Sequence, residues 1–242
     1  MKGSNERRRG EIDYHSLSSL TIAAHELKSP LSLLRQLALS LEADDLTETE
    51  RRDIILHMKL VSERALRLTT DLTKAQRLED GLFKLEPINP VQLCEEVVAE
   101  LSPLYKACGR ELVVVKRQRP LLAIANKDLL RRILMNFADN ALYYSDDVSA
   151  VEVSIASRNH GETIRLGIRD YGPALGLHAW RSLQENMARS EQLHARPSSS
   201  GLGLTIARQF AHAMNGTVGA TRHHDGASFH VDIYASRQLS LI

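Results

Sequence analysis

Apolar residues recur at alternating spacings of three and four along residues 17–41, and this repeat constrains the fold more than any other feature of the chain. It comprises Leu17, Leu20, Ala24, Leu27, Leu31, Leu34, Ala38 and Leu41. This is the a/d spacing of a coiled-coil seam, so it predicts one long helix from about Glu11 to Glu42 with a single packed stripe.

A second stripe of the same kind follows a T-x-x-E capping box at Thr47 and Glu50, which predicts the start of a second helix. The stripe comprises Ile54, Met58, Val61, Ala65, Leu68, Leu72 and Ala75. Two antiparallel helices joined by residues 43–46 cannot bury both stripes alone, so a homodimer forming a four-helix bundle is expected. A monomeric hairpin docked on the rest of the chain is the alternative.

The first helix carries the segment His25-Glu26-Leu27-Lys28-Ser29-Pro30. With Leu17 at position a, His25 falls at b and Ser29 at f, both off the seam, so the imidazole is expected to face solvent. Pro30 removes a backbone bond to the carbonyl of Glu26, at a cost of about 3 kcal/mol, and loosens the helix at the His–Glu pair. A surface histidine near an incidental proline is an equally open interpretation of these residues alone.

Composition limits the classes of function. Hydrophobic residues make up 43% and charged residues 25% of 242, which suits one or two folded domains. Thirty-one basic against thirty acidic residues leave a net charge of +1, which does not indicate a nucleic-acid partner. Cys94 and Cys108 are the only cysteines, so we expect a reducing, cytoplasmic environment. No apolar run approaches the roughly 18 residues of a membrane span.

The N-terminal cluster Arg7-Arg8-Arg9 fits either a solvated start or the cytosolic flank of a membrane helix in a longer sensor. We expect residues 1–10 to be disordered or a linker, residues 11–82 to form the helical hairpin, and residues 88–242 to form a second domain. An N-cap at Asn89 with Pro90 at the first helical position opens that domain.

The second domain mixes helices and strands, which predicts an α/β two-layer sandwich. Helices are expected after Pro90, over 127–144 and over 202–214. Strands are expected over 111–116, 121–125, 151–156, 163–169, 217–222 and 228–234, the last two joined by a hairpin at Asp225-Gly226. The polar stretch 172–200 is expected to be irregular.

Three short motifs in this domain carry candidate chemistry. Asn136 and Asn140 share one helix face, where amide oxygens can hold Mg²⁺ beside phosphates, although taken alone they are better explained as two polar surface residues. Asp170 ends a strand before Tyr-Gly-Pro and can accept a hydrogen bond from an exocyclic amine, or can simply end a strand. Gly201 and Gly203 precede a helix, where backbone N–H groups can approach a polyanion, or mark only a loop.

Taken together, the motifs resemble those of the sensor histidine kinases of two-component signalling. HELKSPL is similar to their phosphoacceptor box, NFADNA to the N box, DYGP to the G1 box and GLGLTIARQFAHAMNG to the G2 box, in family order. The resemblance implies a dimerisation and phosphotransfer hairpin, followed by a gyrase/chaperone-type domain that binds ATP and Mg²⁺. It also implies a response regulator receiver domain as partner.

The resemblance assigns a role to each matching residue. It implies that His25 is phosphorylated, that Glu26 holds the tautomer and takes the ring proton, and that Ser29 orients water in dephosphorylation of the regulator. Asn140, helped by Asn136, would bind Mg²⁺. Asp170 would read the adenine amine. Further nucleotide-binding positions implied in this way are Tyr144, Gly172, Gly176, Gly201, Leu202, Gly203 and Leu204.

The chain departs from the family pattern at several positions. Tyr143 stands where the family has a phosphate-binding lysine, and Ala174 replaces a glycine of the G1 box. Trp180 and Leu183 stand in for a phenylalanine box, and three arginines are candidates to replace the lysine charge: Arg181, Arg189 and Arg196. These departures leave a second reading open, a non-catalytic dimeric scaffold or phosphatase that docks a response regulator. A serine-directed kinase of the same ATP fold would not explain the HELKSP box.

Overall fold

A computed structural model of the chain describes residues 12–43, 45–78, 83–116, 122–144, 149–173, 176–188 and 202–236. These divide into two compact units, the first comprising Met1–Leu72 with Ala195–Leu202 and the second comprising Thr73–His194 with Gly203–Ile242. The division falls inside a helix, and the domain limits expected from the sequence stay predictions.

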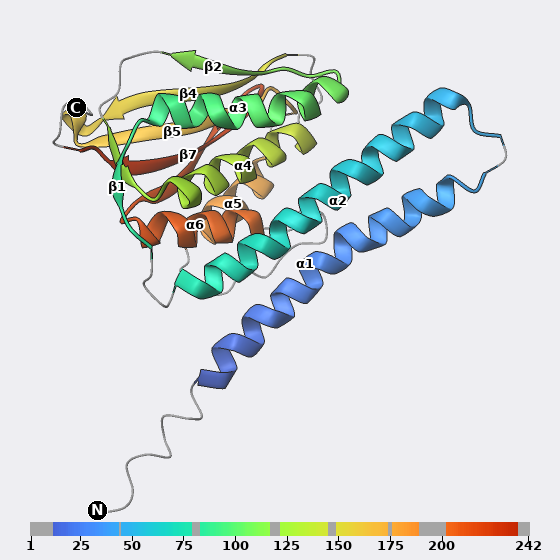
Figure 1. The fold of residues 1–242 in the computed structure, drawn as a ribbon, viewed down its shortest axis with the longest axis horizontal. Coiled ribbons are helices and arrows are strands. Elements are labelled where there is room, and N and C mark those ends of the chain that lie inside the picture. The colour runs from blue at the N-terminus through green and yellow to red at the C-terminus, as the bar shows by residue number, and fades with distance from the viewer. Residues whose placement is uncertain are drawn as a thin grey trace, which may run out of the picture. The chain divides into compact units, whose positions relative to one another are not determined.

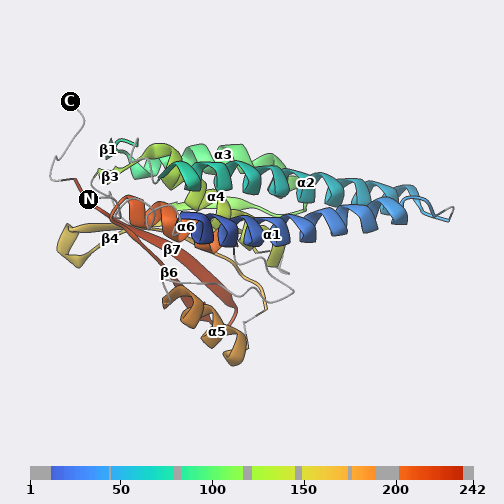
Figure 2. The ribbon, with the colours of Figure 1, turned by 90° about the horizontal axis from the view of Figure 1, so that it is seen from below.

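Two long antiparallel helices, α1 (Ile12–Ser40) and α2 (Glu48–Arg77), lie side by side in the first unit (Figures 1 and 2). α1 continues through Pro30 as one helix. The predicted capping box is confirmed: Glu50 Oε2 accepts from Thr47 N at 2.9 Å, and Glu50 N donates to Thr47 Oγ1 at 3.2 Å. These two bonds fix where α2 begins.

The apolar stripes of the two helices are covered to different extents within one chain. All seven stripe positions of α2 are buried or half-buried, and Ala65 and Leu68 are the most buried of them. On α1, the d positions Leu27, Leu34 and Leu41 are half-buried. The intervening a positions, Ala24, Leu31 and Ala38, are exposed, and Leu31 exposes 59% of its surface. One chain therefore covers only half of the described stripe positions from Ala24 to Leu41.

The second unit is built on a five-stranded sheet. Its strand order is β2 (Leu112–Lys116), β4 (Val151–Arg158), β5 (Thr163–Arg169), β7 (Gly226–Tyr234) and β6 (Thr217–His223). β2 is parallel to β4, and the other pairs are antiparallel. A small second sheet pairs β1 (Glu86–Ile88) with β3 (Ala123–Ala125).

Three helices cover one face of the sheet, α3 (Pro90–Ala107), α4 (Lys127–Tyr144) and α6 (Leu202–Ala213) (Figure 1). The core lies between these layers, because alternate residues of the central strands face the helices. Fully buried side chains from both layers include Ile155, Ile164, Leu166, Leu130, Ile133, Phe137 and Phe210. The predicted two-layer α/β sandwich is confirmed.

Two expectations about this unit were wrong. The stretch 172–200, expected to be irregular, contains helix α5 (Leu177–Ala188), which lies beside β6 (Figure 2). Leu177, Trp180 and Leu183 recur at the helical spacing of three within α5, but the polar residues on both sides of the helix hid this pattern. The second error concerns Pro87, because the prolines at positions 87 and 90 predict a linker before the second domain. Pro87 lies in β1, where an edge strand of two-stranded pairing tolerates a residue without an N–H.

Candidate nucleotide site

Asn136 and Asn140 lie on helix α4, which is packed against the core of the second unit. Its apolar side is buried, and Asn136 on the same helix exposes only 8% of its surface, whereas Asn140 one turn later is half-buried. Asn136 Nδ2 makes a long 3.5 Å hydrogen bond to the carbonyl oxygen of Gly203 in the first turn of α6. The N box and the G2 box, far apart in the sequence, therefore meet at Asn136 and Gly203.

One residue of α3 and one of the loop after it donate hydrogen bonds to backbone carbonyl oxygens of α4. Tyr105 is buried, and its Oη donates to the carbonyl oxygen of Ala138 at 2.7 Å. Arg110 donates to the carbonyl oxygen of Leu142 near the end of α4. Burial raises the pKa of the Tyr105 phenol, so it stays protonated and acts as a donor. These bonds fix the turn of α4 on which Asn140 lies.

Asp170 is a buried carboxylate at the end of β5. It exposes 7% of its surface, its backbone N–H donates to Ala227 O at 2.9 Å, and its Oδ1 accepts from Ala227 N at 2.9 Å. Burial raises its pKa, although the Ala227 hydrogen bond and the charge of Arg169 oppose the shift. A carboxyl held in this way has a fixed direction, which an ordinary strand-ending turn does not require.

Gly226 makes the approach of Asp170 possible. Its φ of +129° lies in a region that favours glycine, and a Cβ atom there would lie 2.3 Å from Asp170 O and 2.9 Å from Gly172 N. Sequence reasoning identified Gly226 only as part of a hairpin turn. The turn is confirmed, because β6 and β7 pair from His223 and Gly226, but the sequence gives no sign that the turn packs on the DYGP segment.

Some of the other predicted site residues lie among the described residues, and others do not. Ser29 is exposed on α1. α1 includes His25 and Glu26, but their side chains lie outside the described residues, so the expected exposure of the imidazole stays a prediction. Gly176 precedes α5, with open space where a side chain would stand, and Leu204 is half-buried on α6. Outside the described residues or side chains lie Tyr143, Tyr144, Ala174, Arg189, Arg196, Gly201 and Leu202.

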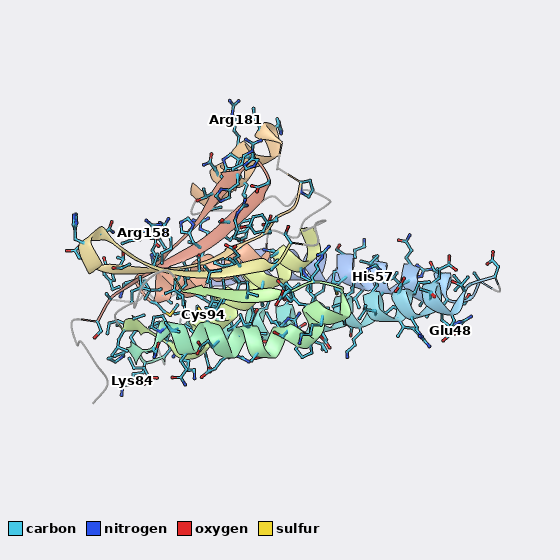
Figure 3. All side chains as sticks on the ribbon, turned by 90° about the horizontal axis from the view of Figure 1, so that it is seen from above. Glu48, His57, Lys84, Cys94, Arg158 and Arg181 are labelled. Carbon is cyan, nitrogen blue, oxygen red and sulfur yellow. The ribbon has the colours of Figure 1, made fainter. Side chains whose placement is uncertain are left out.

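Two further side chains singled out by the sequence are described. Arg181, one of the three candidates for the missing lysine charge, is exposed on α5 (Figure 3). Cys94 is fully buried, and burial raises the pKa of its thiol to about 12. Cys94 is therefore an unreactive core residue.

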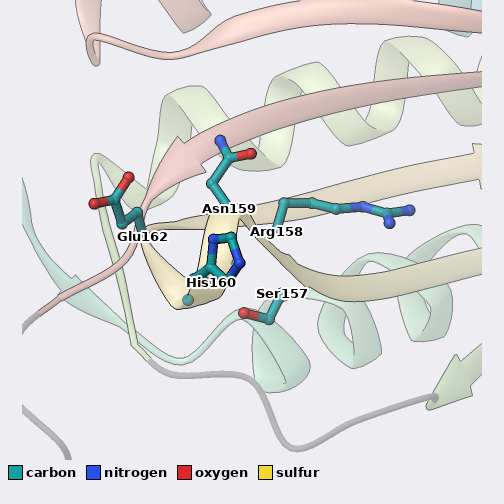
Figure 4. A pocket seen from close by; sticks show the side chains of 6 residues that line it. Ser157, Arg158, Asn159, His160 and Glu162 are labelled. Atoms are coloured by element: carbon teal, nitrogen blue, oxygen red, sulfur yellow. The ribbon is translucent and has the colours of Figure 1, made fainter.

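A polar hollow lies at the β4–β5 turn, away from these residues (Figure 4). It is lined by Ser157, Arg158, Asn159, His160, Gly161 and Glu162. The turn precedes β5, whereas Asp170 follows the last residue of that strand, so the two lie at opposite ends of a seven-residue strand. At about 3.3 Å per residue this is roughly 20 Å. The hollow is thus separate from Asp170.

Comparison with known proteins gives a consistent result. Residues 125–237 match the family described as histidine kinase-, DNA gyrase B-, and HSP90-like ATPase. The sensor protein SphS of Synechococcus elongatus is 31% identical over 219 residues, which are 83% of this chain and 50% of SphS. The chain therefore spans half the length of that relative.

Two solved structures share the fold. The histidine kinase ThkA, in a complex with the response regulator protein TrrA, aligns over 96% of this chain and 64% of ThkA, with a TM-score of 0.60 and 16% identity. Full-length ShkA in complex with AMPPNP aligns over 89% of this chain and 46% of ShkA, with a TM-score of 0.58 and 22% identity.

Proposed function

The chain is a homologue of the sensor histidine kinases and carries a histidine kinase-, DNA gyrase B-, and HSP90-like ATPase domain, and we propose that it is an ATP-dependent protein-histidine kinase. In this proposal it phosphorylates its own His25 and passes the phosphoryl group to an aspartate of a response regulator. Dephosphorylation of the regulator is a further activity of the same hairpin.

The observation that carries the proposal is the directed, buried carboxylate of Asp170. A carboxylate fixed at Oδ1 by Ala227 N retains lone pairs that can accept a hydrogen bond from the exocyclic amine of adenine. The exocyclic amine of adenine is a donor that matches a carboxylate acceptor of fixed direction. We therefore assign Asp170 to the base of ATP.

Asn140 and Asn136 are assigned to the phosphate end of the nucleotide. Their amide oxygens are hard ligands of the kind that Mg²⁺ accepts while keeping several waters, and the half-buried Asn140 suits such a partly hydrated ion. Mg²⁺ would supply neutralisation of the phosphate charge. Gly203, against Asn136 at the start of α6, lets backbone N–H groups approach the phosphates.

The chemistry proposed for the hairpin follows from the residue types. A neutral ring nitrogen of His25 forms the bond to the γ-phosphorus as the bond to the ADP oxygen breaks, and Glu26 takes the ring proton. The exposed Ser29, one turn further along α1, is placed to orient water on a docked phosphorylated regulator.

Dimerisation is supported by the half-covered stripe of α1. Ala24, Leu31 and Ala38 are exposed in one chain although they continue the apolar repeat. A second copy that packs these positions into a four-helix bundle would remove them from water, which favours association by roughly 25 cal/mol per Å² of apolar surface. The partners proposed are therefore a second copy of the chain and a response regulator receiver domain.

Among the residues described, no helix combines the length and the apolar character needed to cross a bilayer. We assign the chain to the cytoplasm, either by itself or as the cytosolic part of a membrane-associated sensor. Its thiols support this assignment, because Cys94 and Cys108 are both free and a reducing compartment keeps cysteines in that form.

The test is incubation of the full chain with Mg-ATP, followed by detection of acid-labile, alkali-stable phosphate. Labelling is expected in the wild type and in His57→Gln, a control at an exposed histidine of α2 (Figure 3). Labelling is expected to be lost in His25→Gln and in Asn140→Ala. Nucleotide binding without labelling of the wild type would favour the scaffold or phosphatase reading, which the absence of the family lysine at Tyr143 motivates.

A further inference from the structure

Arg169, the last residue of β5, connects three segments around Asp170. Its side chain is only 13% exposed. Nη1 donates to the backbone oxygen of Asp170 at 2.8 Å, and Nη2 donates to Oδ1 of Asp225 in the turn between β6 and β7. Its guanidinium carbon also lies 4.5 Å from the centroid of the Tyr171 ring.

These contacts complete a closed set of bonds around Asp170. The backbone N–H and Oδ1 of Asp170 are bonded to Ala227, and its backbone oxygen is bonded to Arg169. Arg169 is in turn bonded to Asp225, two residues before Ala227 in the chain. The β6–β7 turn is thus attached to the end of β5 both by the backbone and by the arginine, with Gly226 packed between them.

The charges favour this arrangement. A guanidinium offers several donors in a fixed plane, so it can serve the Asp170 carbonyl and the Asp225 carboxylate at once. Burial alone would raise the pKa of Asp225, but the hydrogen bond and charge of Arg169 outweigh it and lower that pKa. Because Arg169 is mostly buried, salt screens its interactions less than it screens those of an exposed pair.

We propose that Arg169 is a positioning residue that sets the base selectivity of the nucleotide site by fixing the direction of the Asp170 carboxylate. The inference rests on the proposed binding of ATP. Adenine presents an amine donor where guanine presents a carbonyl acceptor, so a carboxylate with one fixed direction accepts the first and repels the second. A carboxylate that is free to turn away loses both its attraction for the adenine amine and its repulsion of the guanine carbonyl. Loss of Arg169 is therefore expected to lower the selectivity for ATP over GTP more than it lowers the stability of the fold.

Arg165 provides a matched control on the same strand. It lies four residues before Arg169, so its side chain projects from the same face of the sheet. It forms a two-pronged ion pair with Asp232 of β7, with both N–O distances at 2.7 Å. Arg165→Gln therefore removes an arginine–aspartate pair of the same kind, between the same strand and its partner hairpin, without touching Asp170.

The experiment measures the affinities of the full chain for Mg-ATP and, by competition, for Mg-GTP, with thermal unfolding of each variant recorded in parallel. Arg169→Gln is expected to lower the ATP-to-GTP affinity ratio by roughly tenfold, through weaker ATP binding. Asp225→Asn leaves the arginine in place and is also expected to lower the ATP-to-GTP affinity ratio. This variant tests the inference if Arg169→Gln does not fold. Arg165→Gln is expected to leave the ratio within about twofold of wild type.

A double variant, Arg169→Gln with Asp225→Asn, is expected to lower the ratio no further than Arg169→Gln alone, because both changes break one bridge. The inference is overturned if Arg169→Gln and Asp225→Asn keep the wild-type ratio, or if Arg165→Gln lowers it equally. Failure of the wild-type chain to bind Mg-ATP is a different result, because it overturns the proposed function itself.

Discussion

Gly226 has no room for a side chain, because the backbone oxygen of Asp170 lies 2.3 Å from the position that a Cβ atom would take. The contact joins the turn between two strands to the strand end that carries the proposed base-binding carboxylate. It makes the β6–β7 hairpin part of the proposed nucleotide site, although no motif of that hairpin suggests a ligand.

Gly226→Ala is therefore expected to lower the free energy of unfolding by about 2–4 kcal/mol, from the backbone conformation and the clash together. The control is Gly109→Ala, whose φ of +69° is also unfavourable for alanine but which has nothing within 4 Å of the new Cβ. That control is expected to cost about 1 kcal/mol. Urea unfolding measures both, and equal costs would show that the contact with Asp170 is unimportant.

Asp170→Asn is expected to separate stability from binding. Burial raises the pKa of Asp170 in the folded chain, so ionisation of this group makes folding less favourable. The cost is present in full above the folded pKa and disappears as pH falls below the ordinary value for an aspartate. The asparagine variant should gain stability relative to wild type at neutral pH and lose that advantage in acid.

Unfolding at a series of pH values checks this dependence, with ATP affinity measured at neutral pH. The affinity is expected to fall in Asp170→Asn because the amide no longer carries the acceptor charge. A variant that is less stable than wild type at neutral pH and gains on acidification would contradict the assignment.

Tyr105→Phe tests the support behind α4. The change removes the 2.7 Å hydrogen bond to Ala138 O and is expected to cost about 1 kcal/mol, the usual net value of such a bond. Tyr234→Phe, at a tyrosine that exposes 55% of its surface, is the control and is expected to change stability by less than about 0.5 kcal/mol. Thermal or urea unfolding compares them, and indistinguishable midpoints would mean that the buried bond contributes nothing.

Gly203→Ala distinguishes a structural glycine from one kept for a ligand. A Cβ at Gly203 would lie 3.9 Å from the Asn136 side chain, which is ordinary contact, so the fold is expected to tolerate alanine or gain up to about 1 kcal/mol. ATP affinity is nevertheless expected to fall, because the methyl group occupies the space through which phosphates approach the backbone. Titration of the variant and the wild type with Mg-ATP measures this difference. An unchanged affinity for ATP would show that Gly203 is not part of the proposed site.

The sequence predicted what depends on local spacing. The stripe from Leu27 to Leu41 and the Thr47–Glu50 capping box are properties of neighbouring residues. The first helix is present within two residues of its expected limits, and the second begins directly after Thr47 as predicted. Asn89 likewise caps α3, with its Oδ1 accepting from Val91 N at 3.0 Å.

The sequence could not predict contacts that depend on sheet register. Asp170 and Ala227 are 57 positions apart and meet only because β5 pairs with β7. Arg169 and Asp225 are brought together in the same way. A single arginine before an aspartate shows nothing of this pairing. The resemblance of the motifs indicated Asp170 but not the residues that hold it.

We propose that His25 receives the γ-phosphoryl group of ATP, and locating the phosphate after brief incubation with Mg-ATP at neutral to alkaline pH tests this proposal. The 242-residue chain is digested with a protease without acid treatment, and fragmentation mass spectrometry of the peptides locates the modified residue. We expect phosphate on His25 of the wild-type chain and none in Asn140→Ala. Phosphate on Ser29 or another hydroxyl, or a wild-type chain that binds Mg-ATP and stays unmodified, would contradict it.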